Sequence, residues 1–296
     1  MRCDLHVHTV HSGMCTVPVL SRVCLESYNE PHALYERLKQ RGMDLVTVTD
    51  HDSIDAVEEL RRYPDFFLSE EVTCTMPSGT EMHAGVYGIR EHDHIELQRR
   101  RHDVESLLAY AVENKLFVTV NHLYSSLTGP RTEDDFTVFA RDFHGVETLN
   151  GQILKRSNQL ADDFARRFGK PVIGGSDSHT LAGLARTFTE VRGASNATEF
   201  LAGMRRGESI AMGESGDYFK LTSAVWAIGG SLIRATPWMG LFAALFAVAP
   251  AVTLANYFRE MAFAWYWGHS RDTGDLNGWD SCRPENPVAV APEVVL

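Results

Sequence analysis

The chain has 296 residues, of which 44% are hydrophobic and 23% are charged; this composition is typical of a globular protein, and the length suits one large domain or one domain with an appendage. Its formal net charge of −11 argues against sequence-independent binding to nucleic acid and against stable binding to a duplex, because both need a basic surface. A short nucleotide substrate is not excluded, since bound metal ions can supply local positive charge.

The predicted elements alternate through the first two thirds of the chain. Short apolar runs predict strands at residues 3–8, 45–49, 66–75, 82–89, 116–121, 146–149 and 171–174. Amphipathic stretches predict helices at 31–41, 53–62, 103–114, 154–168 and 199–206, with one helix only between His83 and His122. Repeated strand–helix units favour a parallel sheet, either doubly wound or closed as a barrel. Polar motifs at the ends of several strands favour the barrel weakly.

The C-terminal part has a different composition. Residues 235–258 contain no charged side chain, and this run exceeds the about 20 apolar residues that a helix needs to span a bilayer. Residues 221–233 form a second uncharged stretch, and an aromatic group resembling an interfacial belt follows at 265–267. We expect either a buried helical pair that covers the barrel or membrane association through residues 221–267.

These patterns predict three parts. A domain at residues 1–215 is followed by a hydrophobic helical extension at 216–270 and a loosely ordered tail at 271–296. The cysteines are odd in number and have no zinc-finger spacing: Cys3, Cys15, Cys24, Cys74 and Cys282. No signal peptide precedes the first predicted strand. We therefore expect free thiols and a cytoplasmic location, with membrane association as the alternative. Nothing in the sequence indicates the oligomeric state.

Metal-ligand residue types follow several predicted strands. Alternate residues of a strand point the same way, so His6 and His8 present two imidazoles to one side, as a transition-metal chelate requires. Asp50 and His51 follow a β-branched run. Taken alone, each pair has an ordinary structural explanation, such as a core histidine or a polar turn that caps the next helix.

Further candidates lie later in the chain. Asp177 and His179 follow glycines at the end of a strand, where the backbone can approach a ligand closely. Glu71, His83 and His122 each lie in or after a strand. As a set, these imidazoles and carboxylates predict a site for two to three divalent ions of Mn, Zn or Fe. Such ions activate water near neutral pH and offset the charge of phosphate oxygens.

These motifs resemble those of the PHP (polymerase and histidinol phosphatase) family. The resemblance covers residues 1–215 through Asp-Leu-His-Val-His at 4–8, Thr-Asp-His-Asp at 49–52, Asn-His-Leu at 121–123 and Gly-Ser-Asp-Ser-His at 175–179. It implies a distorted seven-stranded (βα) TIM-like barrel with up to three metals at its C-terminal face. Carried over by motif, the first metal would be held by His6, His8, Glu71 and Asp177, the second by Glu71, His83 and His122, and the third by His51 and His179.

The chain departs from the family pattern in one place. Gly13 stands where members commonly have an acid, or a nearby histidine, that completes the third site. His11 and Cys15 are the candidate replacements, and a cysteine ligand would favour zinc or iron over manganese. Alternatively, Cys15 is a small apolar filler. The stretch Glu-Ser-Tyr-Asn-Glu-Pro at 26–31 resembles a subgroup of stand-alone PHP proteins.

Three residues are candidates for contacts to a substrate phosphate. Asn150, Arg156 and Asn158 resemble the Asn-Gly…Arg-x-Asn stretch of the family. A guanidinium can clamp a phosphate through two hydrogen bonds, so Arg156 is the central candidate. The alternative is a surface arginine on an exposed helix face.

The sequence therefore predicts hydrolysis of a phosphoester by a metal-activated water. Asp177 or Asp50 would orient that water, and His179 would protonate the leaving oxygen. The expected substrate is a small phosphorylated molecule, such as a phosphomonoester or a short nucleotide. One alternative is a 3′–5′ exonuclease or phosphodiesterase on short oligonucleotides. Another is a non-catalytic, metal-stabilised scaffold whose tail binds a membrane or a partner, and the missing acid at Gly13 gives this alternative some weight.

Overall fold

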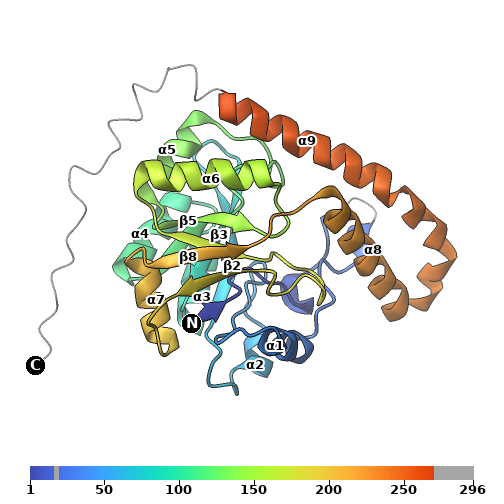
Figure 1. Ribbon diagram of the computed structural model, residues 1–296, viewed down its shortest axis with the longest axis horizontal. Coiled ribbons are helices and arrows are strands. Elements are labelled where there is room, and N and C mark those ends of the chain that lie inside the picture. The colour runs from blue at the N-terminus through green and yellow to red at the C-terminus, as the bar shows by residue number, and fades with distance from the viewer. Residues whose placement is uncertain (17–19, 270–296) are drawn as a thin grey trace, which may run out of the picture.

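The computed structural model describes residues 1–16 and 20–269, which form two β-sheets with helices around them (Figure 1). The larger sheet has five strands in the order β2-β3-β4-β5-β6. Its strands are β2 (Ser69–Thr75), β3 (Glu81–Tyr87), β4 (Phe117–Val120), β5 (Gly145–Asn150) and β6 (Val172–Gly175). The smaller sheet has the order β1-β7-β8, with β1 (Arg2–Cys3), β7 (Thr187–Val191) and β8 (Ser209–Gly213).

The helices match the predicted positions in most places. They are α1 (Pro31–Gln40), α2 (Val57–Leu60), α3 (Glu91–Arg100), α4 (Val104–Glu113), α5 (Glu133–Asp142), α6 (Lys155–Phe168), α7 (Ala197–Arg205), α8 (Tyr218–Ala235) and α9 (Ala249–His269), with 3-10 turns η1 (Val10–Ser12), η2 (Leu20–Arg22) and η3 (Pro237–Val248). Two helices, α3 and α4, lie between His83 and His122, so the prediction of a single helix there was wrong. The helix expected at 53–62 is reduced to the single turn of α2.

The closed seven-stranded barrel is not confirmed, since the described residues form sheets of five and three strands. Nor is the larger sheet all parallel: β2, β3 and β4 pair antiparallel, and only β4, β5 and β6 are parallel. The segments 4–8 and 45–51, both expected in strands, join their neighbours only through isolated bridges such as Val7–Ser178 and His51–Glu71.

Side chains explain why these two segments form no regular ladder. The backbone N–H of Val7 donates to Thr49 Oγ1 at 3.0 Å, and that of Thr9 donates to Asp50 Oδ1 at 2.6 Å. Both donors are therefore taken by side-chain oxygens rather than by carbonyls of a neighbouring strand. The segments still run beside the sheet, so their polar residues reach the same edge as the ends of β4, β5 and β6.

The main core lies between the larger sheet and the helices α4, α5, α6 and α9. Helix α6 buries Leu160, Phe164 and Phe168 at spacings of four, which places them on one face. The helix ends at Gly169, whose left-handed φ of 61° suits a residue without a Cβ. Each fully buried aromatic contributes on the order of 2–3 kcal/mol of hydrophobic stabilisation.

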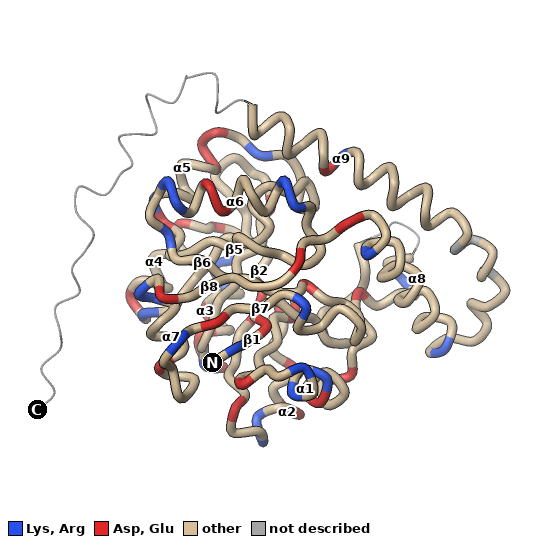
Figure 2. The backbone as a smooth tube through the Cα atoms, in the orientation of Figure 1, with Lys and Arg blue, Asp and Glu red and all other residues tan. Residues whose placement is uncertain are grey.

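Helices α8 and α9, with η3 between them, form a C-terminal arm (Figure 1). The end of the arm joins the core, where the Trp267 ring packs 4.6 Å from that of Phe136. Closer to its start, Leu232 and Met239 pack on Cys24. Between these contacts the arm carries few charges (Figure 2). Its exposed apolar side chains include Phe219, Trp226, Trp238, Leu241, Val252, Phe258 and Trp265.

Among the described residues, no helix has the length and apolar character needed to cross a bilayer. The long uncharged run is divided, because α8 ends at Ala235 and η3 separates it from α9. Surface association of the arm with a membrane stays a prediction. The loosely ordered tail expected at 271–296, and with it Cys282, lies outside the described residues.

Candidate metal centre

The structure brings all eight predicted metal ligands together. His122 directly follows β4, Asp177 and His179 follow β6, and the segments containing His6, His8 and His51 run beside them, while Glu71 and His83 lie on β2 and β3. Four triplets have ligand atoms within 4.8 Å of one another: His6, His8 and Asp177; His6, Glu71 and His122; His51, Glu71 and His83; His8, His51 and His179. The four triplets share residues and form one cluster, whose side chains come from many different strands and strand-like segments.

Glu71 lies at the centre of this cluster. Its Oε2 atom lies 3.1 Å from His6 Nε2, 3.6 Å from His8 Nε2 and 3.3 Å from His51 Nδ1. The carboxylate is completely buried. One oxygen therefore faces three imidazoles that come from two different segments.

The other oxygen of Glu71 faces a second set of side chains. Oε1 lies 3.5 Å from His83 Nδ1 and 3.3 Å from His122 Nε2. It also accepts a hydrogen bond of 2.8 Å from Asn121 Nδ2, which fixes the plane of the carboxylate. A carboxylate with imidazoles on both oxygens has the arrangement of a ligand that bridges two metals.

Asp177 completes the buried side of the cluster. Its Oδ1 atom lies 3.4 Å from His8 Nε2 and 3.6 Å from His6 Nε2. Asn150 Nδ2 donates to its Oδ2 at 3.1 Å, and the Asp177 N–H donates to His6 O at 2.7 Å. The φ of Asp177 is +50°, a conformation that non-glycine residues rarely adopt. The backbone at this position is held against its own preference, as often occurs at functional sites.

Hydrogen bonds behind the cluster fix which nitrogen faces inward. His8 Nδ1 lies 2.8 Å from Ser12 Oγ, and His6 Nδ1 lies 2.7 Å from Glu147 Oε1. An ionised carboxylate only accepts, so His6 Nδ1 carries the proton. The Nε2 atoms of both rings are then left to face Glu71 and Asp177. This is the outer-shell arrangement that orients metal-binding histidines.

The protonation states of His8 and the two carboxylates are those that metal ligands need, whereas Glu71 and Glu26 outweigh burial and raise the pKa of His51 to about 9, so this imidazole would give up a proton on binding a metal. Burial, helped by neighbouring imidazoles, lowers the pKa of His8 to about 3, so its ring is neutral. Burial alone would raise the pKa of Glu71, but His6, His83 and His51 outweigh it and hold that pKa well below its ordinary value. Burial also opposes ionisation of Asp177, yet His6, His8 and His179 hold its pKa below the usual range.

The spacing and the unpaired donors fit metal ions. Two ligands bound tetrahedrally at zinc distances are about 3.3 Å apart, close to the 3.3 to 3.6 Å that separates Glu71 and Asp177 from most of the imidazoles. Six buried imidazole nitrogens have no hydrogen-bond partner among the described residues: His8 Nε2, His51 Nδ1, His83 Nδ1, His122 Nδ1 and His179 Nε2 in the cluster, and His11 Nε2 outside it. Mixed imidazole and carboxylate donors suit Mn, Fe or Zn.

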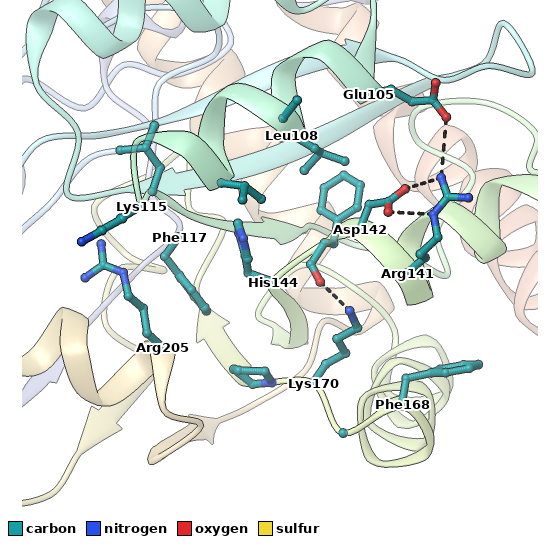
Figure 3. Close-up of a pocket in the computed structure, with 16 residues that line it drawn as sticks. Glu105, Leu108, Lys115, Phe117, Arg141, Asp142, His144, Phe168, Lys170 and Arg205 are labelled. Atoms are coloured by element: carbon teal, nitrogen blue, oxygen red, sulfur yellow. Dashed lines mark hydrogen bonds and ion pairs between the residues drawn. The ribbon is translucent and has the colours of Figure 1, made fainter. Parts of the chain in front are cut away.

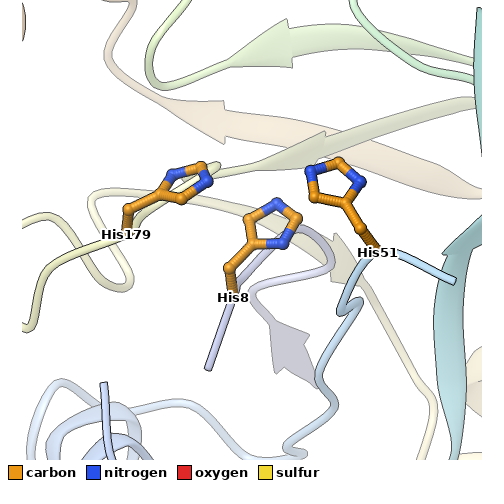
Figure 4. A group of neighbouring side chains, drawn as sticks. All are labelled: His8, His51 and His179. Atoms are coloured by element: carbon orange, nitrogen blue, oxygen red, sulfur yellow. The ribbon is translucent and has the colours of Figure 1, made fainter. Parts of the chain in front are cut away.

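The three imidazoles of the fourth triplet, His8, His51 and His179, lie side by side in space (Figure 4). The His8 ring stacks between the other two, with centroid distances of 4.7 Å to His51 and 4.4 Å to His179. The His51 and His179 side chains are 17% and 20% exposed, whereas that of His8 is 1% exposed. Substrate can therefore reach the cluster from the side of His51 and His179.

Asp50 does not join the cluster, although the sequence suggested a catalytic role. Its Oδ1 and Oδ2 atoms accept hydrogen bonds of 2.6 Å from the Thr9 N–H and hydroxyl. The carboxylate is completely buried. Its place in the structure is that of a clamp on the turn after the first His-x-His segment.

The predicted phosphate contacts are also placed elsewhere. Asn150 donates to Glu147 and Asp177, and so it orients the cluster from behind. Asn158 is buried and bonded to the backbone of Asn150 at both ends of its amide. Arg156 is an exposed residue at the start of α6, with its guanidinium beside Gly268 of α9. Contact of these three residues with a substrate phosphate stays a prediction.

Sequence reasoning missed Glu26. Its Oε2 atom lies 3.3 Å from His51 Nε2, and its Oε1 atom lies 3.6 Å from His179 Nε2. The stretch at 26–31 was noted for its family resemblance, but nothing local marks its first residue as a ligand. By contrast, His11 and Cys15, the candidate replacements for the acid missing at Gly13, belong to none of the triplets. His11 Nε2 instead faces Glu59 at 3.6 Å.

All ion pairs of the cluster carboxylates within the described residues are to histidines. This holds for Glu26, Glu71, Glu147 and Asp177. No lysine or arginine neutralises them, so the ligand set keeps its negative charge for cations. Positive charge for a phosphate would have to come from the bound ions and the imidazoles.

A cavity of about 970 Å³ lies away from this cluster (Figure 3). Phe117, His144 and Pro171 line it at the N-terminal ends of β4, β5 and β6, together with Lys170 and Arg205. Ligands of parallel α/β sheets bind outside the opposite, C-terminal ends of the strands. The position of the histidine cluster matches that rule and the position of the cavity does not, so we assign the candidate site to the cluster.

The chain is similar in sequence or in fold to several known proteins. The model of the family described as PHP-associated matches residues 155–209. A two-domain protein from Bacteroides vulgatus, described as containing a predicted PHP-like metal-dependent phosphoesterase, shares the fold with a TM-score of 0.56 and 17% identity over 77% of this chain and 69% of its own. PsfC from Pseudomonas syringae shares it with a TM-score of 0.54 and 16% identity over 88% of this chain and 98% of its own. No curated protein sequence matches the chain.

Proposed function

We propose that the chain is a member of the PHP family and a metal-dependent phosphoesterase that hydrolyses a small phosphorylated substrate. The observation that carries the proposal is the position of Glu71, whose two oxygens each face imidazoles within 3.6 Å. A buried carboxylate in that position has no structural need for so many histidines. It would serve two ligand sets, because each of its oxygens faces a different group of imidazoles.

The ligand sets follow from the distances. His6, His8 and Asp177 would hold one ion together with Glu71. Once bound, divalent ions would supply Lewis acidity toward water and toward phosphate oxygens. The native metal is one of Mn, Zn or Fe on ligand chemistry alone.

A second ion would share Glu71. His83 and His122 face its Oε1 atom, and Asn121 fixes the plane of the carboxylate that they would share. The His83 side chain is 19% exposed, so this position lies nearer to solvent than the first.

The chain's own residues prepare the reacting centre. Asp177 has one oxygen fixed by Asn150 and the other directed at His6 and His8. With the plane of its carboxylate set in this way, Asp177 can orient an attacking water by accepting a hydrogen bond from it. The charge that it needs for this role is kept by its lowered pKa, since the imidazoles around it outweigh burial.

His179 has only one nitrogen available to the site. Its Nδ1 atom lies 3.1 Å from Asp177 O and is satisfied there, which leaves Nε2. One nitrogen cannot both ligate a metal and protonate a leaving group at the same moment. The convergence of His51 and Glu26 on the same region favours the ligand role over the proton-donor role predicted from sequence.

The test is hydrolysis of a small panel of substrates with Mn, Zn or Fe added, followed as phosphate release for the monoesters and as formation of the released alcohol or nucleotide for the diesters. The panel holds an alkyl phosphomonoester, a nucleoside bisphosphate, a short oligonucleotide and an aryl phosphodiester. We expect turnover that needs metal and that falls at least about 100-fold in Asp177→Asn, because loss of a ligand exceeds the 10–100-fold cost of losing an outer-shell partner. Asp162→Asn, which changes a surface partner of Arg166 on α6, is the matched control.

The panel also separates the alternatives. If the oligonucleotide is the preferred substrate, the proposal of a phosphomonoesterase is replaced by that of a nuclease acting at the same metal centre. A folded, metal-loaded chain that turns over none of the four substrates would count against hydrolysis and for a metal-stabilised scaffold.

A further inference from the structure

The group formed by His8, His51 and His179 has no carboxylate at the position where the family resemblance led us to expect one. Gly13 stands where an acid was expected, its φ is +86°, and a Cβ built on it would contact nothing within 4 Å. The backbone there therefore presents open space toward its surroundings. Whatever completes the group must reach this space from another segment.

Glu26 lies directly beside Gly13. Its backbone N–H donates to Gly13 O at 3.0 Å, and the preceding residue, Leu25, forms an antiparallel bridge with Met14. The two residues are neighbours across a short two-stranded contact. A side chain at position 26 can thus occupy the region that a side chain at position 13 would have filled.

The segment after Glu26 is fastened to the ligand-bearing backbone. Ser27 Oγ donates to His8 O at 2.9 Å. Asn29 Nδ2 donates to His8 O at 3.0 Å and to Ser178 O at 3.2 Å. Both side chains are buried. The segment is therefore positioned by the residues that flank His8 and His179, and not by chance packing of a surface loop.

The carboxylate of Glu26 faces two imidazoles from different segments. The distances are 3.3 Å from Oε2 to His51 Nε2 and 3.6 Å from Oε1 to His179 Nε2. Both exceed the about 2.7–2.9 Å of a charge-assisted hydrogen bond, and they are close to the about 3.3 Å that separates two ligands of one tetrahedral zinc ion. His179 Nε2 is buried and has no hydrogen-bond partner among the described residues.

We propose that Glu26 is the carboxylate ligand of a third metal position, which it forms with His51 and His179 in place of the acid missing at Gly13. The inference rests on the proposed metal-dependent function. Glu26 supplies the anionic donor, and the two imidazoles supply neutral ones. The donor set is then oxygen and nitrogen, without the sulfur that Cys15 would have contributed.

The other two candidates for this position are placed elsewhere. His11 faces Glu59, outside the cluster. Cys15 pairs through its backbone N–H with Cys24 O at 3.0 Å, and its side chain packs with an apolar group that includes Leu232 and Met239. The alternative reading of Cys15 as an apolar filler fits these contacts. Glu26 alone of the three brings its donor atoms to the imidazoles.

The experiment counts metal ions on the full chain. Wild type, Glu26→Gln and Glu59→Gln are dialysed against the same buffered free concentrations of Zn²⁺ or Mn²⁺, and bound metal is measured by mass spectrometry. Glu59 is the matched control, because it also faces two imidazoles, His11 and His32, outside the cluster. Circular dichroism and thermal unfolding verify that each variant is folded.

We expect three ions on wild type and on Glu59→Gln, and two on Glu26→Gln at a free concentration that saturates wild type. The weakest dissociation constant should rise at least about 100-fold, above the 10–100-fold cost of an outer-shell change. Glu26→Asp, which keeps the charge but shortens the reach, should bind the third ion with intermediate affinity. It also serves as the second variant if Glu26→Gln fails to fold.

Two results would overturn the inference while leaving the proposed function standing. One is a third ion held equally well by wild type and Glu26→Gln. The other is two ions on all forms together with metal-dependent turnover. Wild type that binds no ion at all would overturn the proposed function itself, and the assignment of Glu26 with it.

Discussion

Glu147 accepts a hydrogen bond of 2.9 Å from the backbone N–H of His122 on one carboxylate oxygen, while the other oxygen holds His6 Nδ1 at 2.7 Å. One buried side chain thus sets the ring of His6 and the backbone of His122, whose φ of +31° is unusual for a residue with a Cβ. The two residues belong to different proposed metal positions, and Glu147 couples their geometry.

Replacing this carboxylate should weaken metal binding without removing a ligand. In Glu147→Gln the amide can no longer accept on both sides, so His6 loses the partner that keeps its Nε2 atom free. We expect metal affinity and activity to fall about 10–100-fold. A titration with a competing chelator measures the affinity, and Glu105→Gln, an exposed acid on α4, is the control. Equal affinities of Glu147→Gln and wild type would show that His6 is oriented by other contacts.

Removal of metal should destabilise the fold. The apo cluster holds Glu71 and Asp177 buried among imidazoles, and ions that bind only the folded chain add stability by mass action, about 2.7 kcal/mol at a free concentration of 100 dissociation constants. We expect the midpoint of thermal unfolding to fall on treatment with a chelator and to recover when Zn²⁺ or Mn²⁺ is returned. In Asp177→Asn the response should be smaller. If the midpoint of thermal unfolding did not change with metal, protons on the imidazoles rather than metal ions would balance the charge of the carboxylates.

Asp50 should prove structural. Asp50→Asn loses an acceptor for one of the two 2.6 Å hydrogen bonds from Thr9, which should cost about 1–3 kcal/mol in the free energy of unfolding because a buried donor is left unpaired. Thr9→Val removes the hydroxyl alone, and the double variant should lose less than the sum of the single ones. Urea unfolding measures all three. Strict additivity would contradict a direct Asp50–Thr9 interaction, and a loss of bound metal in Asp50→Asn would return Asp50 to the site.

Lys170 should make stability depend on pH. Its amine lines the cavity at the N-terminal ends of the strands and donates to Phe143 O at 2.6 Å. Burial lowers the pKa of Lys170 to about 8, although Asp142 raises it slightly. Below pH 8 the Lys170 amine is charged in both the folded and the unfolded chain, and the folded chain bears the full free-energy cost of burying that charge. Between about 8 and the ordinary pKa of 10.5 the unfolded chain binds more protons, so the stability of wild type rises with pH.

Lys170→Met lacks this dependence. The stability of wild type minus that of the variant should therefore increase by about 1–2 kcal/mol between pH 7 and pH 10. Lys115→Met, at an exposed lysine of the same cavity (Figure 3), controls for general loss of charge. A difference that stays flat over this range would mean that Lys170 keeps its charge throughout.

The motifs predicted which residues come together, because each of these residue types follows a strand segment whose end lies at the same edge of the fold. That these residues bind metal stays a prediction. The regular strands at 4–8 and 45–51 were wrong, since pairing there depends on Thr49 and Asp50 side chains that compete for the backbone. Such competition has no periodic signature.

Glu26 and Glu147 could not be assigned from sequence for a different reason. Their roles arise from contacts across the chain, with Glu147 reaching His6 over 141 positions. The surroundings of Asn150 and Asn158 were not predictable either: their amides have chemistry suited to a phosphate, but packing turns them to the backbone and to Asp177. The residue types indicated which groups these side chains can bind, but the fold determines which groups they contact.

The C-terminal arm contacts two segments that each lie next to a residue of the metal centre. Leu232 and Met239 pack on Cys24, two residues before Glu26. On the other side, Glu260 accepts hydrogen bonds from the hydroxyl of Ser125 and the N–H of Ser126, in the loop that begins at His122.

In evolutionary terms, a ligand that moves from position 13 to position 26 becomes dependent on a distant helix for its support. A carboxylate ligand at position 26 and the C-terminal arm would then be gained or lost together. A related chain without helices corresponding to α8 and α9 should fill the third position from the first loop instead. Engineers who shorten this protein at residue 215 should expect to lose an ion as well as a tail.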